Sequence, residues 1–285
     1  MTVTLRRGTP ADAGTLGDIC YRAFKAIAEA HNFTPDVPSP GIGAELLKAC
    51  LLHDRFVVFV AELEGTIVGS NVLDERNPIS GVGPITVDPA QQNDGAGRAL
   101  MQAVMKRSTE RGFLGIRLVQ AGYHNRSLGL YSKLGFRVRE QLACFQGPPL
   151  GQGLPGYLVR RASPQDLAVA NELCARVHGH PRGGELADAI AQGTARIVVR
   201  SGRVTGYATS VAFFGHAVGE TSDDVKALIA AAESFAGPGF LVPTRNAELM
   251  QWCLGAGLRI TQTMTLMSIG LYSEPVGAWL PSVTY

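Results

Sequence analysis

The stretch DPAQQNDGAGRALMQAVMKR, residues 88–107, places two glycines at the start of a predicted helix. Gly95 and Gly97 open an amphipathic run, which predicts a helix over 95–111. The first N–H groups of a helix have no partner inside it and carry about half a positive charge. Because glycine has no Cβ, a phosphate can approach these N–H groups closely. The alternative is a plain turn, in which Asn93 or Asp94 caps the helix.

Regular elements are predicted on both sides of this helix. The strand segments are rich in Val, Ile, Leu and Phe, and Thr9-Pro10 is a favourable helix start. We predict strands over 2–7, 56–63, 66–73, 81–88, 114–121 and 136–145, and helices over 11–30 and 125–135. This order favours the α/β class, with a mixed, mostly antiparallel sheet flanked by helices.

The second half of the chain repeats the first. LRRGTPADAGTLGDIC resembles VRRASPQDLAVANELC, and the same offset separates Arg7 from Arg161 and Cys20 from Cys174. Between the copies, GPPLGQGLPG contains only Gly, Pro, Leu and Gln, which favours a linker. We therefore predict two tandem domains of the same class, with the C-terminal tail lying on a surface. The predicted boundaries are 1–146 for the first domain, 147–156 for the linker and 157–285 for the second.

Composition narrows the class of protein. Across 285 residues, 26 basic side chains oppose 24 acidic ones, which argues against a protein that coats nucleic acid. No apolar run reaches the roughly 18 to 20 residues of a membrane span, and no apolar block follows the first arginines as in a signal peptide. The five cysteines are scattered without CxxC spacing, which is typical of reduced thiols in a cytoplasmic protein.

In this context the glycine turn resembles the phosphate turn of the GCN5-related N-acetyltransferase (GNAT) family. The matching residues are Gln92, Gly95 and Gly97, followed by Asn125, Tyr131 and the pair Gly135-Phe136. The resemblance covers roughly residues 3–145 and is weaker in the second half. Rossmann and Walker loops fit poorly, because the third Rossmann glycine and the Gly-Lys-Ser/Thr sequence are absent. The chain is thus identified as a tandem bacterial member with a degenerate C-terminal half.

The resemblance implies that the first domain binds acetyl-CoA as co-substrate. The strand over 85–87 would pair with the pantetheine arm in a gap between two strands that splay apart. The turn would hold the pyrophosphate with its N–H groups. The implied cofactor-binding residues are Ile85, Thr86, Val87, Gln92, Asn93, Asp94, Gly95, Ala96, Gly97, Arg98, Asn125 and Tyr131.

The resemblance also implies a proton donor for the departing thiolate, at Tyr131. A phenol with a pKa near 10 stays protonated at neutral pH; the alternative is an aromatic residue that only fills space. A backbone N–H near Val87 would stabilise the developing oxyanion. For the general base, the candidates are Glu75, at the end of a hairpin strand, and His31. Glu75 can equally be a solvated turn carboxylate.

His31 and Asp36 lie in AEAHNFTPDVPSP, which matches the variable loop that shapes acceptor pockets in the family. His31 is the one near-neutral titrating group there, and the alternative is an ordinary loop histidine. His178 and His180 lack a third ligand, so no metal is predicted.

In the second copy, Asp223 and Asp224 replace the phosphate-turn glycines at the start of a helix predicted over 219–235. Carboxylates there would satisfy the helix dipole and repel a pyrophosphate. We therefore expect an N-acetyltransferase that acts on a small-molecule amine through a ternary complex. We expect a monomer or homodimer, with no nucleic-acid or membrane partner. The alternatives are a non-catalytic acyl-CoA-binding or sensing module and a protein N-acetyltransferase.

Overall fold

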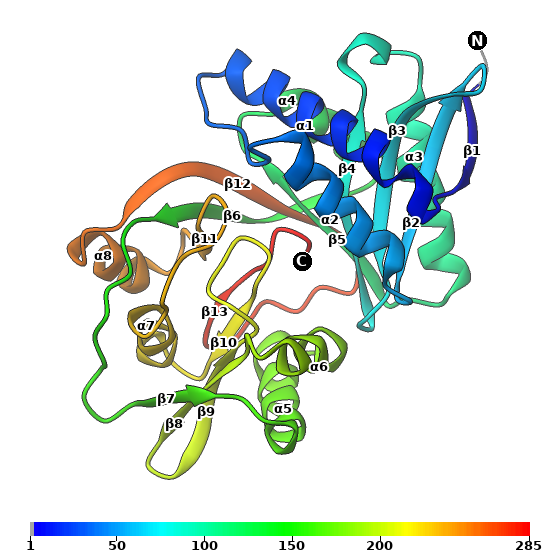
Figure 1. Ribbon diagram of the computed structural model, residues 1–285. Helices are drawn as coiled ribbons and strands as arrows, with labels where there is room; N and C mark the ends of the chain where they lie inside the picture. The colour runs from blue at the N-terminus through cyan, green and yellow to red at the C-terminus, as the bar shows by residue number, and fades with distance from the viewer. Residues whose placement is uncertain (1–2) are drawn as a thin grey trace.

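The computed structural model describes residues 3–285, which form two lobes (Figure 1). The N-terminal half contains β1 (Val3–Arg7), α1 (Ala13–Ala30), α2 (Pro40–Leu52), β2 (Phe56–Leu63), β3 (Thr66–Asp74), β4 (Ile79–Val87), α3 (Ala96–Glu110), β5 (Gly115–Ala121), α4 (Asn125–Lys133) and β6 (Arg137–Gln146). The predicted α/β class is confirmed. Sequence analysis missed α2, which begins after Ser39, whose hydroxyl accepts a hydrogen bond from the Ile42 N–H at 3.3 Å.

The C-terminal half follows the same alternation of helices and strands. It contains β7 (Leu158–Arg161), α5 (Leu167–His178), α6 (Gly183–Gln192), β8 (Arg196–Arg200), β9 (Arg203–Ala208), β10 (Ala217–Gly219), α7 (Ser222–Ala230), β11 (Phe240–Pro243), α8 (Ala247–Gly255), β12 (Arg259–Gly270) and β13 (Ala278–Leu280). Residues 147–157, which include the predicted linker, contain no helix or strand.

The two halves share a detailed structural signature at their first helix. The Arg6 guanidinium donates two hydrogen bonds of 2.8 Å to Asp12, which caps the turn beginning at Thr9. At the equivalent positions, Arg160 donates bonds of 2.8 and 2.6 Å to Asp166. The same capping box built twice, from equivalent residues, supports the internal duplication that the sequence predicts.

Helices cover both faces of the N-terminal sheet, which is why β2 has few exposed residues. Alternate residues of a strand point to opposite faces. Val58 and Val60 pack in the cluster that contains Leu16 of α1 and Leu47 of α2. On the other face, Val57 packs in a cluster with residues of α3. The sheet is thus the middle layer of the domain, and α3 is held firmly against it.

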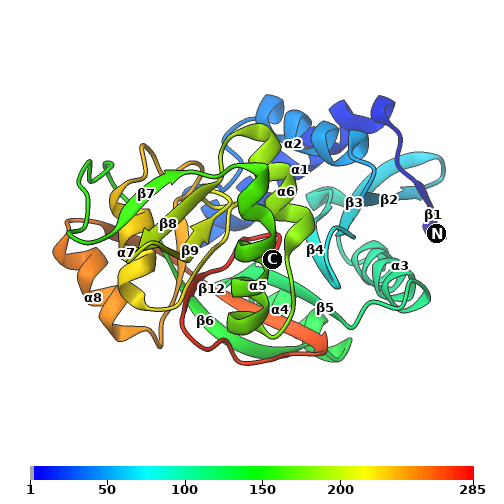
Figure 2. The ribbon, with the colours of Figure 1, turned by 90° about the horizontal axis from the view of Figure 1, so that it is seen from below.

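The C-terminal half contributes strands to the N-terminal sheet, which sequence analysis did not predict. The larger sheet has the order β1-β2-β3-β4-β5-β12-β6-β11, so two C-terminal strands belong to the N-terminal sheet. β12 runs antiparallel between β5 and β6, and β6 in turn pairs with β11. Figures 1 and 2 show β12 and β6 crossing together from one lobe to the other. The division at 147–156 stays a prediction, and the C-terminal half completes the sheet of the N-terminal half.

β4 and β5 separate partway along their length. Their parallel pairing runs from Ile79 and Gly115 to Val82 and Leu118 and stops there. Against β3, the register of β4 shifts beyond Val82, and Gly83 takes a φ of +131°, in the region that favours glycine. The predicted splaying is confirmed: residues 83–87 keep β3 on one side and leave β5 on the other.

The C-terminal tail corrects our expectation of a segment that lies on a surface. β13 pairs with β10 in the smaller sheet, and Trp279 and Leu280 are buried. Farther on, Tyr285 is 3% exposed, with its hydroxyl 3.0 Å from His180 Nε2 and hydrogen-bonded to Arg117 of β5. Apolar and aromatic side chains gain more by filling the space between the halves than by covering an outer face.

All five cysteines are buried free thiols, as expected of core residues. Burial raises the pKa of Cys20 and Cys50 to about 12, so these thiols stay protonated and unreactive. Within residues 3–285, no helix is both long and apolar enough to cross a membrane.

Candidate active site

A cavity of about 960 Å³ lies where β4 and β5 separate. One part of its wall comes from β4, the start of α3 and α4. The other part comes from α1, the loop after it, and the C-terminal half, including Phe213, Met264 and Thr284. The divergence of the two strands opens the sheet, and the entry of β12 into this sheet brings C-terminal residues to the same opening.

The N-terminal end of α3 faces this cavity, with open space in front of Gly95. Gly95 is the N-cap with a φ of +87°, and a Cβ built on it would meet no atom within 4 Å. The first turn contains no acidic residue, so the helix N–H groups keep their positive potential. The start of α3 therefore offers both space and positive potential, which suit an anionic group such as a phosphate.

Most of the predicted cofactor-binding residues line the cavity. Asp94 is the exception, because it does not contribute to the wall. The residues that do are Ile85, Thr86, Val87, Gln92, Asn93, Gly95, Ala96, Gly97, Arg98, Asn125 and Tyr131. The fold brings them together from three elements, although their role in binding stays a prediction.

Sequence analysis missed Arg126, which also lines the cavity. Its guanidinium donates hydrogen bonds of 2.7 Å to Gln92 Oε1 and 2.9 Å to Asn93 Oδ1. These bonds place a permanent positive charge beside the mouth of α3. Arg126 directly follows Asn125 in the first turn of a predicted helix, and this position in the sequence could have identified it as a cavity residue.

Tyr131 lies on α4 with its ring 6.1 Å from that of Phe136 and is 5% exposed. It contributes to the wall of the cavity, so it is a packed aromatic residue that also reaches the site. Burial raises the pKa of its phenol to about 12, opposed by a hydrogen bond with Ser127. The phenol is therefore protonated at neutral pH, as a proton donor must be.

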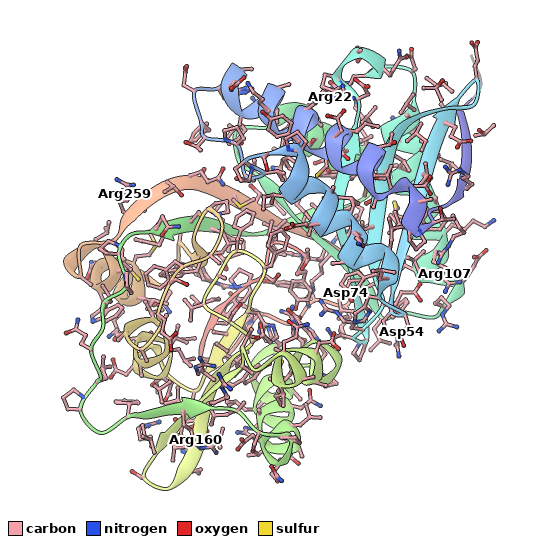
Figure 3. The ribbon with its side chains drawn as sticks, viewed as in Figure 1. Arg22, Asp54, Asp74, Arg107, Arg160 and Arg259 are labelled. Carbon is pink, nitrogen blue, oxygen red and sulfur yellow. The ribbon has the colours of Figure 1, made fainter. Side chains whose placement is uncertain are left out.

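Glu75 is not part of the site, which corrects its proposed role as general base. Its carboxylate is held by Arg107, at 2.7 and 3.1 Å, and it is absent from the wall of the cavity. Figure 3 shows Arg107 near one end of the N-terminal half and Arg22 near the other. Arg22 binds Asp88, next to the phosphate turn, at 2.8 Å. Glu75 instead fixes the far end of α3 to the sheet.

His31 does reach the cavity, from the end of α1. Its Nδ1 lies 2.9 Å from the Ile27 carbonyl oxygen and its ring stacks on Tyr123 at 5.3 Å. If Nδ1 donates to this carbonyl oxygen, Nε2 of His31 carries the free lone pair. The role of His31 as general base stays a prediction. His124 also lines the cavity, but its Nδ1 accepts the Ser127 N–H at 3.3 Å and caps α4. Burial lowers the pKa of His124, which keeps it neutral.

Asp36 is a second carboxylate candidate, from the loop that the sequence associated with the acceptor pocket. It lines the cavity and accepts a hydrogen bond of 2.7 Å from Gln262 Nε2. Gln262 lies on β12, so the contact exists only because that strand enters the N-terminal sheet. The sequence contained no signal that would have paired residues so far apart.

The second copy presents a closed helix mouth. In α7, which is shorter than predicted, Asp224 accepts bonds from the Thr221 N–H and hydroxyl at 2.9 and 2.8 Å. Asp223 forms an ion pair with Lys226 at 2.8 Å. In this capping box the Asp224 carboxylate accepts the N-cap N–H and the Thr221 side chain accepts the N–H of Asp224, so the two helix starts differ in charge and in access.

Solved structures share the fold of the whole chain. A candidate acetyltransferase from Pyrococcus horikoshii matches with a TM-score of 0.75 and 17% identity, covering 97% of this chain and 92% of that one. A GCN5-related N-acetyltransferase from Sphaerobacter thermophilus matches at 0.62 and 18%, covering 95% and 96%. A tandem GNAT protein from the clavulanic acid biosynthesis pathway matches at 0.57 and 13%, covering 94% and 98%. These matches define the class of fold as that of tandem acetyltransferase-like proteins.

A family model matches part of the sequence. Residues 24–136 match the model of the acetyltransferase (GNAT) family, and these residues contain the diverging strands, the glycine turn and Tyr131. The family match thus covers a segment within the N-terminal half of the chain. No curated protein matches the chain in sequence.

Proposed function

We propose that this protein transfers an acetyl group from acetyl-CoA to a primary amine of a small molecule. The observation that carries the proposal is the open mouth of α3, with Gly95, facing a cavity between separated strands. Acetyl-CoA would supply an activated acyl group as a thioester. The N–H groups at the start of α3 and the charges of Arg98 and Arg126 would hold its phosphates, and the free edge of residues 83–87 would hold its arm.

Side chains around the gap between β4 and β5 would carry out the proton transfers of the reaction. One N–C bond forms and one C–S bond breaks, so the nitrogen loses a proton and the sulfur gains one. Tyr131 supplies the proton to sulfur, because its phenol is protonated and reaches the cavity. The gap between β4 and β5 would hold the amine close to the thioester carbonyl and limit the access of water.

The direct test is release of free thiol when the protein is mixed with acetyl-CoA and a panel of primary amines. Turnover with at least one amine is the expected result. Binding of acetyl-CoA without turnover on any amine would instead favour a sensing module. Acetylation of peptides alone would favour a protein N-acetyltransferase.

Replacing Tyr131 by phenylalanine should lower kcat on the order of 100-fold, because one proton donor is lost. The affinity for acetyl-CoA should change little, since the ring and its packing remain. Steady-state kinetics and calorimetry measure the two quantities separately. Tyr157→Phe, in the second half and outside the cavity, is the matched control. A rate within about twofold of the unaltered protein would remove Tyr131 as the acid.

The chain should bind one acetyl-CoA, and none in its second half. At about 5 Å, each contact between a carboxylate and a phosphate at α7 costs roughly 1 to 3 kcal/mol. The capping box of Thr221 and Asp224 also engages the N-cap and N3 N–H groups, which would otherwise be open to a phosphate. Calorimetric titration should therefore give a site number near one per chain. A number near two would show that α7 is a working phosphate site.

A further inference from the structure

The acceptor end of the cavity is apolar and is built by both halves. Beyond Tyr131, the wall includes aliphatic and aromatic side chains from α1, the loop after it, the loop between β9 and β10, and β12. These are Phe24, Ile27, Val37, Phe213, Phe214 and Met264. A wall of this kind favours a ligand whose body is apolar and penalises a charged one.

Charges are distributed unevenly along the cavity. The cations in its wall are Arg98 in the first turn of α3, Arg126 in the first turn of α4 and Lys133 at the end of α4, and the C-terminal half contributes none. Asp36 is the only carboxylate among the described residues that line it. The acceptor end therefore offers one negative group and no arginine or lysine to pair with a carboxylate on the ligand.

Asp36 is held in place rather than free in solution. Its Oδ1 accepts the bond from Gln262 Nε2, and Gln262 is 6% exposed on β12. The groups that face Asp36 from the other packed elements are Tyr123, after β5, and Cys144 of β6. Burial raises the pKa of both groups, Tyr123 to about 12 and Cys144 to about 11, so both are neutral at pH 7. No fixed cation neutralises the Asp36 carboxylate among these neighbours.

We propose that the acceptor is a primary amine with an apolar, uncharged body, such as an arylalkylamine, and that Asp36 receives the amino group and its proton. This proposal rests on the acetyltransferase function proposed above. As the N–C bond forms, the nitrogen becomes strongly acidic and passes one proton to the Asp36 carboxylate. The sulfur whose bond breaks gains one proton from Tyr131. Exchange with water restores both side chains, so no proton is gained or lost at the site.

Asp36 is suited to this role because burial raises its pKa to about 6, while the bond from Gln262 opposes the rise. A carboxyl group with this pKa is ionised at neutral pH and is a stronger base than an exposed aspartate. Its base form increases as the pH rises through about 6, so the contribution of Asp36 should increase over the same interval.

The first test compares amines on the unaltered protein. Phenethylamine should be acetylated with kcat/KM about 100-fold above that of phenylalanine, whose added carboxylate meets Asp36 without a cation. Spermidine, with further ammonium groups, should also be a poor acceptor. Equal turnover of phenylalanine or spermidine would overturn this proposal and leave the acetyltransferase function intact. Absence of thiol release with all three amines would also overturn this proposal, whereas absence of release with every amine of the wider panel would remove the acetyltransferase function.

The second test removes the carboxylate. Asp36→Asn should lower kcat/KM for phenethylamine by about 100-fold and leave the calorimetric Kd for acetyl-CoA unchanged. Asp54→Asn, on an exposed side chain outside the cavity, is the matched control (Figure 3). The ratio of unaltered to Asp36→Asn rates should rise as the pH increases through about 6, because the ionisation of the amine cancels in the ratio. A ratio independent of pH would overturn the assignment of Asp36.

Gln262 is a positioning residue in this scheme, and its variant gives a distinct signature. Gln262→Leu removes the hydrogen bond that favours the ionised carboxylate. The pH at which activity rises should therefore move upward, whereas a merely structural defect would lower the rate at every pH alike. An unchanged midpoint would show that Gln262 does not act through Asp36.

Discussion

Gly95→Glu is expected to abolish binding of acetyl-CoA while the protein stays folded. The new carboxylate would enter the open space in front of α3 and could accept the N–H bonds meant for a phosphate. It would also add like-charge repulsion of roughly 1 to 3 kcal/mol per contact with the diphosphate. Together these effects predict a loss of affinity of at least about 100-fold, which corresponds to about 2.7 kcal/mol.

The measurement is the calorimetric Kd, with thermal unfolding as a check on the fold. Any side chain at Gly95 pays a backbone cost of about 1 to 2 kcal/mol, because its φ is +87°. Gly65→Glu is the matched control, since Gly65 has a φ of +78° and open space around it but lies in the turn between β2 and β3. The control should bind acetyl-CoA normally. Normal binding by both variants would contradict the phosphate site.

Residues 1–146 expressed alone are expected not to fold. Without β12, the facing edges of β5 and β6 lose their partner, and Met264, Leu266 and Met267 leave the core. Each of these buried side chains contributes roughly 1.5 to 3 kcal/mol. Their sum is comparable with the whole stability of an ordinary domain, about 5 to 15 kcal/mol.

Circular dichroism and a denaturant titration would show this as the absence of a cooperative transition. The matched control is the folded full chain cut by a protease within 147–157, a segment without helix or strand. That preparation has the same broken connection but retains β12, and it should unfold cooperatively. A cooperative transition for residues 1–146 alone would show that β12 is not essential for folding of the N-terminal half.

Local features of the fold could be predicted from the sequence. The β2–β3 hairpin and α3 were predicted to within one residue, because strand alternation, turns and helix starts are encoded by near neighbours. The glycine-containing start of α3 is also a local feature that the sequence encodes. It depends on the backbone conformation of a single residue, Gly95, which the sequence shows directly.

Non-local features could not be predicted in this way. Glu75 and Asp36 are both carboxylates near strand or helix ends, and sequence analysis named Glu75 as a candidate base although local pattern does not distinguish the two. Their difference is set by distant partners, Arg107 for Glu75 and Gln262 for Asp36. The position of β12 in the N-terminal sheet could not be predicted either, because β12 has the same local sequence pattern whichever sheet it joins.

The position of β12 between β5 and β6 also has a consequence for synthesis of the chain. β5 leaves the ribosome well before β12, and residues 122–258 must be translated in between. At roughly 5 to 20 residues per second, this interval lasts on the order of ten seconds. During it, the β5 segment has no β12 to pair with, and its exposed backbone and apolar side chains can pair with other chains. Translation speed and chaperone access over this segment should therefore govern how much of the newly made protein escapes aggregation.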